Sequence, residues 1–236
     1  MKILASDYDG TLNYNGFDSR KREAIDRWRS AGNLFGLVSG RSADSLWELA
    51  ERDGFGFDFM IANNGAAVLD RNRKLLFDIR CDGSLVFPLL HDLFEWKCPS
   101  AYLTADHTRV IQPEEMNALP SVPWFYQIST FLEAEQDAAQ ISERIRGRFG
   151  AHLNPLPNGT CIDCVPAGAS KAEGIRRLIE ALGAGPDDVI TVGDQMNDAS
   201  MISAFRSYAM ANGAEAIRRM AGGIVPGIPE LIEREL

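Results

Sequence analysis

The chain has 236 residues, 45% hydrophobic and 24% charged, which is the composition of an ordinary globular protein with a substantial core. Its formal net charge of −9 disfavours nucleic acid and anionic membrane surfaces as partners, because both are negatively charged. No apolar run is long enough for a signal peptide or a membrane-spanning helix. We therefore expect a cytoplasmic protein, a monomer or weak homodimer, with neither nucleic acid nor membrane as partner.

The first apolar run, Ile3–Ala5, predicts a short buried strand, and two acids, Asp7 and Asp9, follow it. Side chains at i and i+2 of an extended segment point to the same side, so both carboxylates could face one point. Gly10 allows a tight turn directly afterwards. Because ligands of open parallel sheets bind outside the carboxyl ends of strands, this is a candidate site; an ordinary Asp-Gly turn is the alternative.

Strands and helices alternate along the following part of the chain. We expect a helix capped by Ser19 with Ala24, Ile25 and Trp28 on its apolar side, a strand at Leu34–Val38, and a helix capped by Ser42 that runs through Ala50. A strand at Phe59–Ala62 and a hairpin of Ala67–Leu69 with Leu75–Phe77 follow. This alternation predicts an α/β fold with a Rossmann-like parallel-sheet core and helices on both faces.

Between about 82 and 162 the pattern changes and prolines become frequent. Helical patterns at 85–96 and 133–149 stand beside strand-like runs at 109–112 and 124–131, which predicts an inserted α+β cap domain. The core should then comprise 1–81 and 163–236, with a strand at Val189–Val192, a later strand at Tyr208–Ala211, and helices after Ser170, Asp198, Gly213 and Pro229. The cysteines, Cys161-x-x-Cys164 included, lack zinc-type partners and are expected to be reduced.

Each predicted core strand ends in polar residues. Ser39 and the Gly40 amide stand at a helix start, a setting that favours anions. Lys171 lies in the first helical turn after Ser170, where a cation opposes the helix dipole, so a ligand role explains it better than stability does. The alternatives are a plain turn or cap for Ser39 and a solvated surface position for Lys171.

The strand Val189–Val192 runs into Gly-Asp-Gln-Met-Asn-Asp, which adds Asp194, Asn197 and Asp198. Four carboxylates at one point, from Asp7, Asp9, Asp194 and Asp198, would repel one another by roughly 4 kcal/mol per pair at about 4 Å. A divalent cation relieves this repulsion, and oxygen ligands without histidine suit Mg²⁺ better than zinc. Such a site fits nucleophilic attack on phosphorus.

Four segments together resemble the motifs of the haloacid dehalogenase superfamily of phosphohydrolases. They are Asp7–Leu12 (Asp-Tyr-Asp-Gly-Thr-Leu), Val38–Arg41 (Val-Ser-Gly-Arg), Lys171, and Gly193–Asp198, and they occur in the order of that family. The resemblance implies that Asp7 is the nucleophile, that Asp9 is the general acid/base, and that Ser39, Gly40, Lys171 and Asn197 bind phosphate, with a metal-ligand role as the alternative for Asn197. It also implies a Mg²⁺-dependent phosphatase that hydrolyses small phosphomonoesters through an aspartyl-phosphate.

The position of the insert narrows the resemblance. Only residues 13–38 separate the first two motifs, whereas the insert lies between the second and third, as in relatives with a C2 cap. Asn63–Ala66 (Asn-Asn-Gly-Ala) and Ala209–Asn212 (Ala-Met-Ala-Asn) are similar to the Cof-type branch. Those relatives act on sugar phosphates and similar small metabolites, while the short cap resembles that of phosphoglycolate or sucrose-phosphate phosphatases, which suggests a narrower specificity.

We expect substrate contacts at Arg41, Asn64, His107 and Arg109, with a structural or surface role as the alternative for each. A phosphotransferase or phosphomutase is an alternative activity, although the missing helical cap disfavours it. Outside the enzymes, a phospho-receiver domain or a catalytically silent sugar-phosphate sensor is the alternative; receivers are about half this length, and retention of both Asp7 and Asp9 disfavours a silent sensor.

Overall fold

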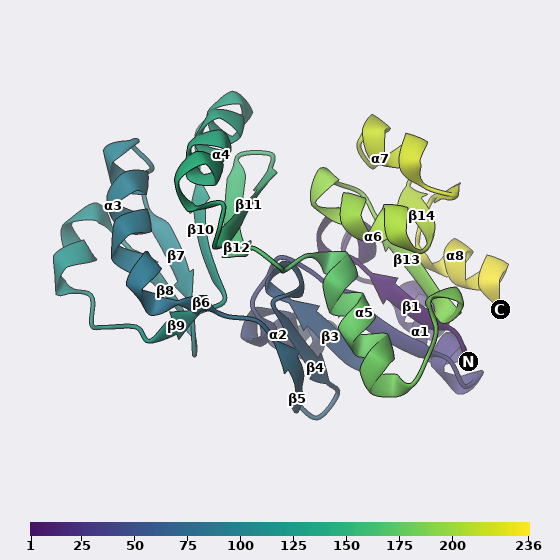
Figure 1. Cartoon of the computed structure of the whole chain (residues 1–236). Coiled ribbons are helices and arrows are strands. Elements are labelled where there is room, and N and C mark those ends of the chain that lie inside the picture. The colour runs from purple at the N-terminus through teal and green to yellow at the C-terminus, as the bar shows by residue number, and fades with distance from the viewer. The chain divides into compact units, whose positions relative to one another are not determined.

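The computed structural model describes all residues from Met1 to Leu236 and divides into two units. The core unit comprises Met1–Asp78 and Ser170–Leu236, and the cap unit comprises Ile79–Ala169. The cap unit extends beyond the expected range 82–162 at both ends. At its carboxyl end the reason is that strand β12 (Cys161–Pro166) pairs throughout its length within the sheet of the cap unit. Figure 1 labels the helices and strands of both units.

An eight-stranded sheet forms the centre of the core unit, in the order β15-β14-β13-β1-β2-β3-β4-β5. Its strands are β1 (Ile3–Ser6), β2 (Leu34–Val38), β3 (Phe59–Ala62), β4 (Ala67–Asp70), β5 (Leu75–Asp78), β13 (Val189–Gly193), β14 (Arg206–Met210) and β15 (Gly223–Val225). The strands from β15 to β3 are parallel, and β3, β4 and β5 are antiparallel neighbours. The predicted α/β fold with a parallel-sheet core is confirmed.

Helices cover both faces of this sheet. Alternate residues of β1 enter different hydrophobic clusters: Leu4 packs with α1 (Ser19–Ser30), α2 (Ala43–Asp53) and α8 (Ile228–Glu235), while Ile3 and Ala5 pack with the helices of the other face. These other helices are α5 (Lys171–Leu182), α6 (Ala199–Ala204) and α7 (Glu215–Met220). In Figure 1, α5 lies across the near face of the sheet. Because helices bury both faces of the sheet, the core strands are continuous apolar runs in the sequence.

Most predicted helix ends are found where the sequence places them. The Ser42 Oγ accepts the N–H of Ser45 at the start of α2, as expected. For α1 the expected cap is wrong by one residue, because Asp18, and not Ser19, accepts the N–H of Lys21. An aspartate fills this position as well as a serine does, so composition alone does not decide between two adjacent capping residues.

The cap unit is built on a five-stranded antiparallel sheet in the order β11-β12-β10-β7-β8. Its elements are β6 (Cys81–Asp82), α3 (Val86–Glu95), β7 (Ala101–Thr104), β8 (Thr108–Ile111), β9 (Trp124–Phe125), β10 (Gln127–Phe131), α4 (Glu135–Phe149), β11 (Leu153–Asn158) and β12. Both helices bury their apolar sides against one face of the sheet. The four cysteines are free, and burial raises the pKa of the Cys81 thiol to about 12.

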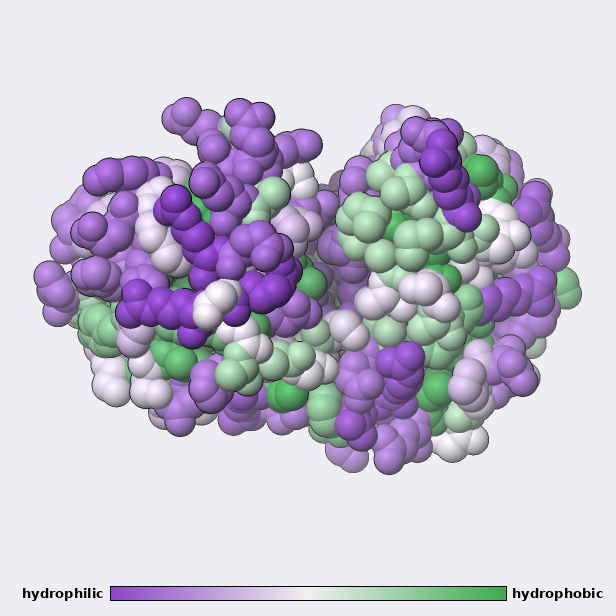
Figure 2. Space-filling view, turned by 45° about the horizontal axis from the view of Figure 1, so that its top comes forward, coloured by the Kyte–Doolittle hydropathy of each residue, from purple (hydrophilic) through white to green (hydrophobic).

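No helix of the structure combines the length and apolar composition needed to cross a membrane. The face of the molecule seen in Figure 2 is largely hydrophilic, and hydrophobic residues lie in patches among polar ones. Exposed apolar residues of this kind are normal on a globular surface.

Candidate active site

Three polar residues follow neighbouring parallel strands at the same edge of the core sheet. Asp7 follows β1, Ser39 follows β2, and Asp194 follows β13. Because Ser6 is in register with Leu37 on one side and with Val192 on the other, the three strands end at nearly the same level. The edge formed by their carboxyl ends therefore carries the candidate site.

A buried lysine joins two of the acids. The Nζ of Lys171 lies 2.7 Å from Asp7 Oδ1 and 2.5 Å from Asp198 Oδ1, and all three side chains are almost completely buried. Carboxylate oxygens of Asp7, Asp194 and Asp198 all lie within 4.8 Å of one another. The structure thus brings together four predicted site residues that are separated by up to 191 positions in the sequence, from Asp7 to Asp198.

The start of α5 fixes the position of Lys171. Ser170 caps the helix, because its Oγ accepts the N–H of Glu173 at 3.1 Å. The turn after β3 packs tightly against this helix start: a Cβ added to Gly65, whose φ is +98°, would lie 2.0 Å from the Ser170 carbonyl oxygen. A residue with a side chain at position 65 would push the helix start, and Lys171 with it, away from Asp7.

The two acids after β13 are held by hydrogen bonds. Asp198 Oδ2 accepts the N–H of Asp194 at 2.8 Å and that of Gln195 at 3.1 Å, so this side chain closes its own loop. Asp194 Oδ1 accepts the hydroxyl of Thr11 at 2.8 Å. Thr11 belongs to the turn that follows Asp7, and this hydrogen bond links the first and fourth motifs.

Burial dominates the electrostatics of the cluster. It raises the pKa of Asp7 well above its usual range, although the ammonium of Lys171 acts in the opposite direction. Burial likewise raises the pKa of Asp194 to about 6. Burial alone would lower the pKa of Lys171, but the carboxylates of Asp198 and Asp7 outweigh it, so this lysine stays cationic. Three carboxylates share one cation, which leaves the cluster short of positive charge.

This donor set fits a hard divalent cation. All three acids offer oxygen ligands, and no histidine or cysteine takes part. Close by in sequence, the Oδ1 of Asn197 is buried without a hydrogen-bond partner in the chain, although buried amide oxygens are normally satisfied. A buried oxygen without a donor is suited to a cation or to a group that donates a hydrogen bond.

Asp9 is not a member of the cluster, in contrast to the expected set of four carboxylates. Its carboxylate forms a two-point ion pair with Arg41, with Nε 2.6 Å from Oδ2 and Nη2 2.9 Å from Oδ1. The i, i+2 argument fails here because β1 already ends at Ser6, and the chain turns sharply at Gly10, whose φ is +76°. Arg41, expected as a substrate contact, is engaged by Asp9.

The residues that follow β2 and β3 are joined to one another by hydrogen bonds. Ser39 is buried, and its Oγ accepts the N–H of Arg41 at 3.2 Å, directly after Gly40. Asn64, expected as a substrate contact, is fully buried, and its N–H donates to the Ser39 carbonyl oxygen at 2.9 Å. Asn63 was not among the predicted site residues, yet its Nδ2 is buried without a partner in the chain. The signal in the sequence was the Asn-Asn-Gly run after an apolar strand.

The two expected cap residues lie together in the cap unit, at the turn between β7 and β8. The Nε of Arg109 lies 2.8 Å from His107 Nε2, and His107 Nδ1 lies 3.1 Å from Asp106. These three side chains are half-exposed or exposed and interact locally.

The chain as a whole matches the family of haloacid dehalogenase-like hydrolases over residues 4–227. The chain belongs to this family. The resemblance inferred from the four motifs is thereby confirmed, and the protein is an enzyme of the hydrolase class.

Three relatives illustrate the range of this hydrolase family. The chain is 27% identical to a phosphoglycolate phosphatase of Halorubrum lacusprofundi, covering 94% of this chain and 89% of the relative. It is 25% identical to the 5-amino-6-(5-phospho-D-ribitylamino)uracil phosphatase YcsE of Bacillus subtilis, covering 94% and 88%. The structure of a HAD/COF-like hydrolase from Plasmodium vivax has a TM-score of 0.85 at 19% identity, covering 100% and 95%, which shows a shared fold.

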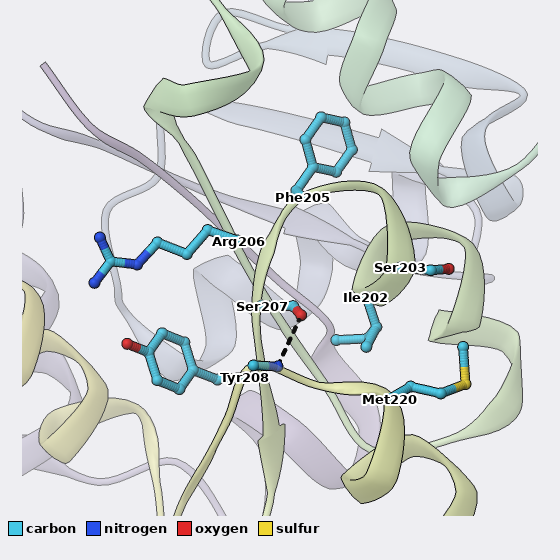
Figure 3. A pocket seen from close by; sticks show the side chains of 8 residues that line it. Ile202, Ser203, Phe205, Arg206, Ser207, Tyr208 and Met220 are labelled. Carbon is cyan, nitrogen blue, oxygen red and sulfur yellow. Dashed lines mark hydrogen bonds between the residues drawn. The ribbon is translucent and has the colours of Figure 1, made fainter.

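A separate cavity of the hydrolase lies at the opposite edge of the core sheet. It measures about 590 Å³ and is lined by residues of α6, β14 and α7, including Ile202, Phe205, Tyr208 and Met220. Arg206, the first residue of β14, points away from Ile202 and Met220 (Figure 3) and pairs with Glu235 instead. The cavity contains no acid cluster and is not the candidate active site.

Proposed function

We propose that this hydrolase is a Mg²⁺-dependent phosphatase that hydrolyses small phosphomonoesters through an aspartyl-phosphate on Asp7. The observation that carries the proposal is the buried cluster of Asp7, Asp194 and Asp198 around Lys171 at the carboxyl edge of the sheet. Structural ion pairs rarely leave an excess of carboxylates in a buried position, because each uncompensated charge is expensive. A functional site accounts for this arrangement.

In the proposed first step, a carboxylate oxygen of Asp7 attacks phosphorus, and the bond between phosphorus and the substrate's ester oxygen breaks. Lys171 is close enough to orient Asp7 and adds positive charge where the phosphate oxygens gather. Ser39 and the amide of Gly40 follow the adjacent strand and supply hydrogen-bond donors for phosphate. In the second step, water attacks phosphorus, releases inorganic phosphate and regenerates Asp7.

Asp9 is the proposed general acid/base. It donates a proton to the departing ester oxygen in the first step and accepts a proton from the attacking water in the second, so its protonation state is restored. Its half-exposed carboxylate is accessible to a ligand, unlike the buried carboxylate of Asp198.

Asp7, Asp194 and Asp198 are the residues that would hold Mg²⁺, with the buried Oδ1 of Asn197 as a further oxygen. When bound, the ion would supply positive charge that offsets the excess of carboxylates and the charge of the phosphate. Asp9, which the sequence predicts as a further metal ligand, has its carboxylate paired with Arg41 and does not belong to this set.

The phosphoglycolate phosphatase and the phosphatase YcsE act on phosphomonoesters of very different size, so the shared core does not itself distinguish substrates. We propose a small sugar or polyol phosphate, or a similar metabolite, with the cap unit as the source of selectivity. Polar side chains such as His107, Arg109 and Gln127 make this unit suited to recognising hydroxyl groups.

A panel of small phosphomonoesters, assayed with Mg²⁺ for phosphate release, tests this proposal. We expect turnover of several sugar or polyol phosphates and of phosphoglycolate, and none after Asp7→Asn. Asp187→Asn, which changes an exposed acid of the same unit, is the matched control and should remain active. Absence of turnover across the panel, or activity retained in Asp7→Asn, would overturn the proposed chemistry.

A further inference from the structure

We propose that Arg41 is a positioning residue for Asp9 and does not bind substrate. This inference rests on the proposed function, in which Asp9 transfers the proton to the leaving oxygen. The geometry that supports it is the two-point ion pair, in which the Nε and Nη2 of Arg41 meet both oxygens of Asp9 at 2.6 and 2.9 Å. A planar guanidinium that binds both oxygens fixes the direction of the carboxylate as well as its location.

Asp9 needs such a partner because little else holds it. Its side chain is 50% exposed, and it lies next to Gly10, in a turn beyond the end of β1. No other side chain of the core lies within hydrogen-bond distance of its carboxylate, whereas Asp194 and Asp198 are buried and hydrogen-bonded. An exposed carboxylate without a partner samples several rotamers, and a misplacement of about 1 Å can reduce the rate about 100-fold.

Arg41 is itself held in place by contacts of its backbone and of its guanidinium group. Its N–H donates to Ser39 Oγ at 3.2 Å, and its carbonyl oxygen accepts the N–H of Asn63 at 2.9 Å. Its guanidinium lies 6.0 Å from the centre of the Tyr8 ring, and Nη1 lies 3.5 Å from the Ser45 hydroxyl. The loops after β1, β2 and β3 therefore converge on this one residue.

The ring beneath Arg41 is fixed as well. Tyr8 is completely buried, and its hydroxyl donates to Asp53 Oδ2 at 2.8 Å and accepts from Arg52 Nη2 at 3.1 Å. Tyr8 stands between Asp7 and Asp9 in the chain, so one buried ring fixes the backbone that carries both residues. Arg41 then fixes the remaining freedom, which is the side chain of Asp9.

A positioning residue and a substrate ligand give different kinetics. The value of kcat/KM covers the steps up to release of the leaving group, for which alkyl phosphates need a proton and para-nitrophenyl phosphate hardly does. If Arg41 acts through Asp9, Arg41→Met lowers kcat/KM at least about 10-fold for an alkyl phosphate and less than about 3-fold for para-nitrophenyl phosphate. A ligand of the phosphate group, which the two substrates share, would lower both by the same factor; a ligand of the alkyl group would lose activity independently of Asp9, which the double-mutant cycle detects.

The double-mutant cycle provides the second readout. In an Asp9→Asn background, Arg41→Met should change kcat/KM by less than about 2-fold, because the group on which Arg41 acts is already altered. Arg41→Lys, which presents a single ammonium, should restore only part of the alkyl phosphate activity. Arg218→Met changes an exposed arginine on α7 and serves as the matched control.

Melting temperatures separate positioning from misfolding. The ion pair is half-exposed, so Arg41→Met should melt within about 3 °C of the wild type. If that variant does not fold, the Arg41→Lys variant carries the same comparison. Equal losses on both substrates, or full additivity with Asp9→Asn, overturn the assignment of Arg41 while leaving the phosphatase intact. A wild-type enzyme that hydrolyses neither substrate overturns the proposed function, and the role of Arg41 with it.

Discussion

A Cβ added to Gly10 would lie 2.3 Å from the Oδ2 of Asp194, a distance that real structures essentially never show. The φ of +76° at Gly10 is also unfavourable for any residue with a side chain. The turn after the proposed nucleophile and the acid after β13 are therefore in direct contact, and this contact is possible only with glycine at position 10.

Gly10→Ala should consequently displace Asp194 and lower phosphatase activity at least about 10-fold. Gly16→Ala is a matched control, because Gly16 has a similar φ of +80° but nothing lies within 4 Å of an added Cβ. Both variants should lose about 1 kcal/mol of stability through backbone strain, whereas only Gly10→Ala should lose activity. Equal activity in the two variants, measured beside their unfolding free energies, would show that the contact has no functional consequence.

Lys171→Met should abolish activity and destabilise the protein. The substitution leaves the buried carboxylates of Asp7 and Asp198 without their shared cation, and breaking a buried pair in this way costs about 3–5 kcal/mol. We expect this loss of stability in metal-free buffer and a partial recovery of stability when Mg²⁺ is added, both measured by urea unfolding. The exposed Lys74→Met is the control. A Lys171→Met protein as stable as the wild type without metal contradicts this account of the cluster.

The sequence was sufficient to predict the core because local patterns and overall topology agree there. The strands β1, β2, β3 and β13 are short apolar runs, and the helices between them begin and end with recognisable caps. The sequence pattern does not predict the edge strand β15, because its three residues, Gly223–Val225, are too few to show a periodicity.

The cap unit was less predictable for a physical reason. Pro155 and Pro157 indicated a break in regular structure, yet both lie within β11 at the edge of the five-stranded sheet. An edge strand has one row of N–H groups that need no partner in the sheet, so it tolerates proline. The run 124–131 was expected as one strand, but it is divided at Tyr126 into β9 and β10, which belong to different sheets.

For the site, the sequence indicated which residues gather at one edge, since strand order and polar strand ends determine that. It did not indicate how individual side chains pair. The partnership of Asp9 with Arg41 depends on the turn at Gly10 and on the position of Arg41 over the Tyr8 ring. Such side-chain directions beyond a strand end are set by tertiary contacts and have no periodic signal.

The raised pKa of Asp194 predicts a pH-dependent stability. Its value of about 6 lies above that of a carboxyl in the unfolded chain, about 3.9, so the folded protein binds this proton more tightly. In metal-free buffer, stability should fall as pH rises from about 4 to about 6, by about 2 kcal/mol from this residue. Below about 4 both states are protonated, and the contribution is constant.

Asp194→Asn should therefore be more stable than the wild type at pH 7 in EDTA and should lack this part of the pH dependence. Asp7, whose pKa is also raised, acts in the same direction, so the comparison of wild type with Asp194→Asn isolates one residue. Urea unfolding at several pH values between about 4.5 and 7.5 provides the measurement, with Asp187→Asn as control. Identical pH profiles for wild type and Asp194→Asn would refute the assignment.

Binding of Mg²⁺ should offset the cost of burying the ionised carboxylates of the cluster. Chelation by EDTA is expected to abolish phosphatase activity, and Mg²⁺ should restore it, because the carboxylates of Asp7, Asp194 and Asp198 lack sufficient positive charge on their own. Mg²⁺ at 100 times its Kd stabilises the folded state by about 2.7 kcal/mol, which should raise the melting temperature by roughly 5–10 °C. Asp194→Asn should lose most of this shift, whereas Asp187→Asn should retain it. Full activity in EDTA together with a melting temperature independent of Mg²⁺ would exclude a metal site at this cluster.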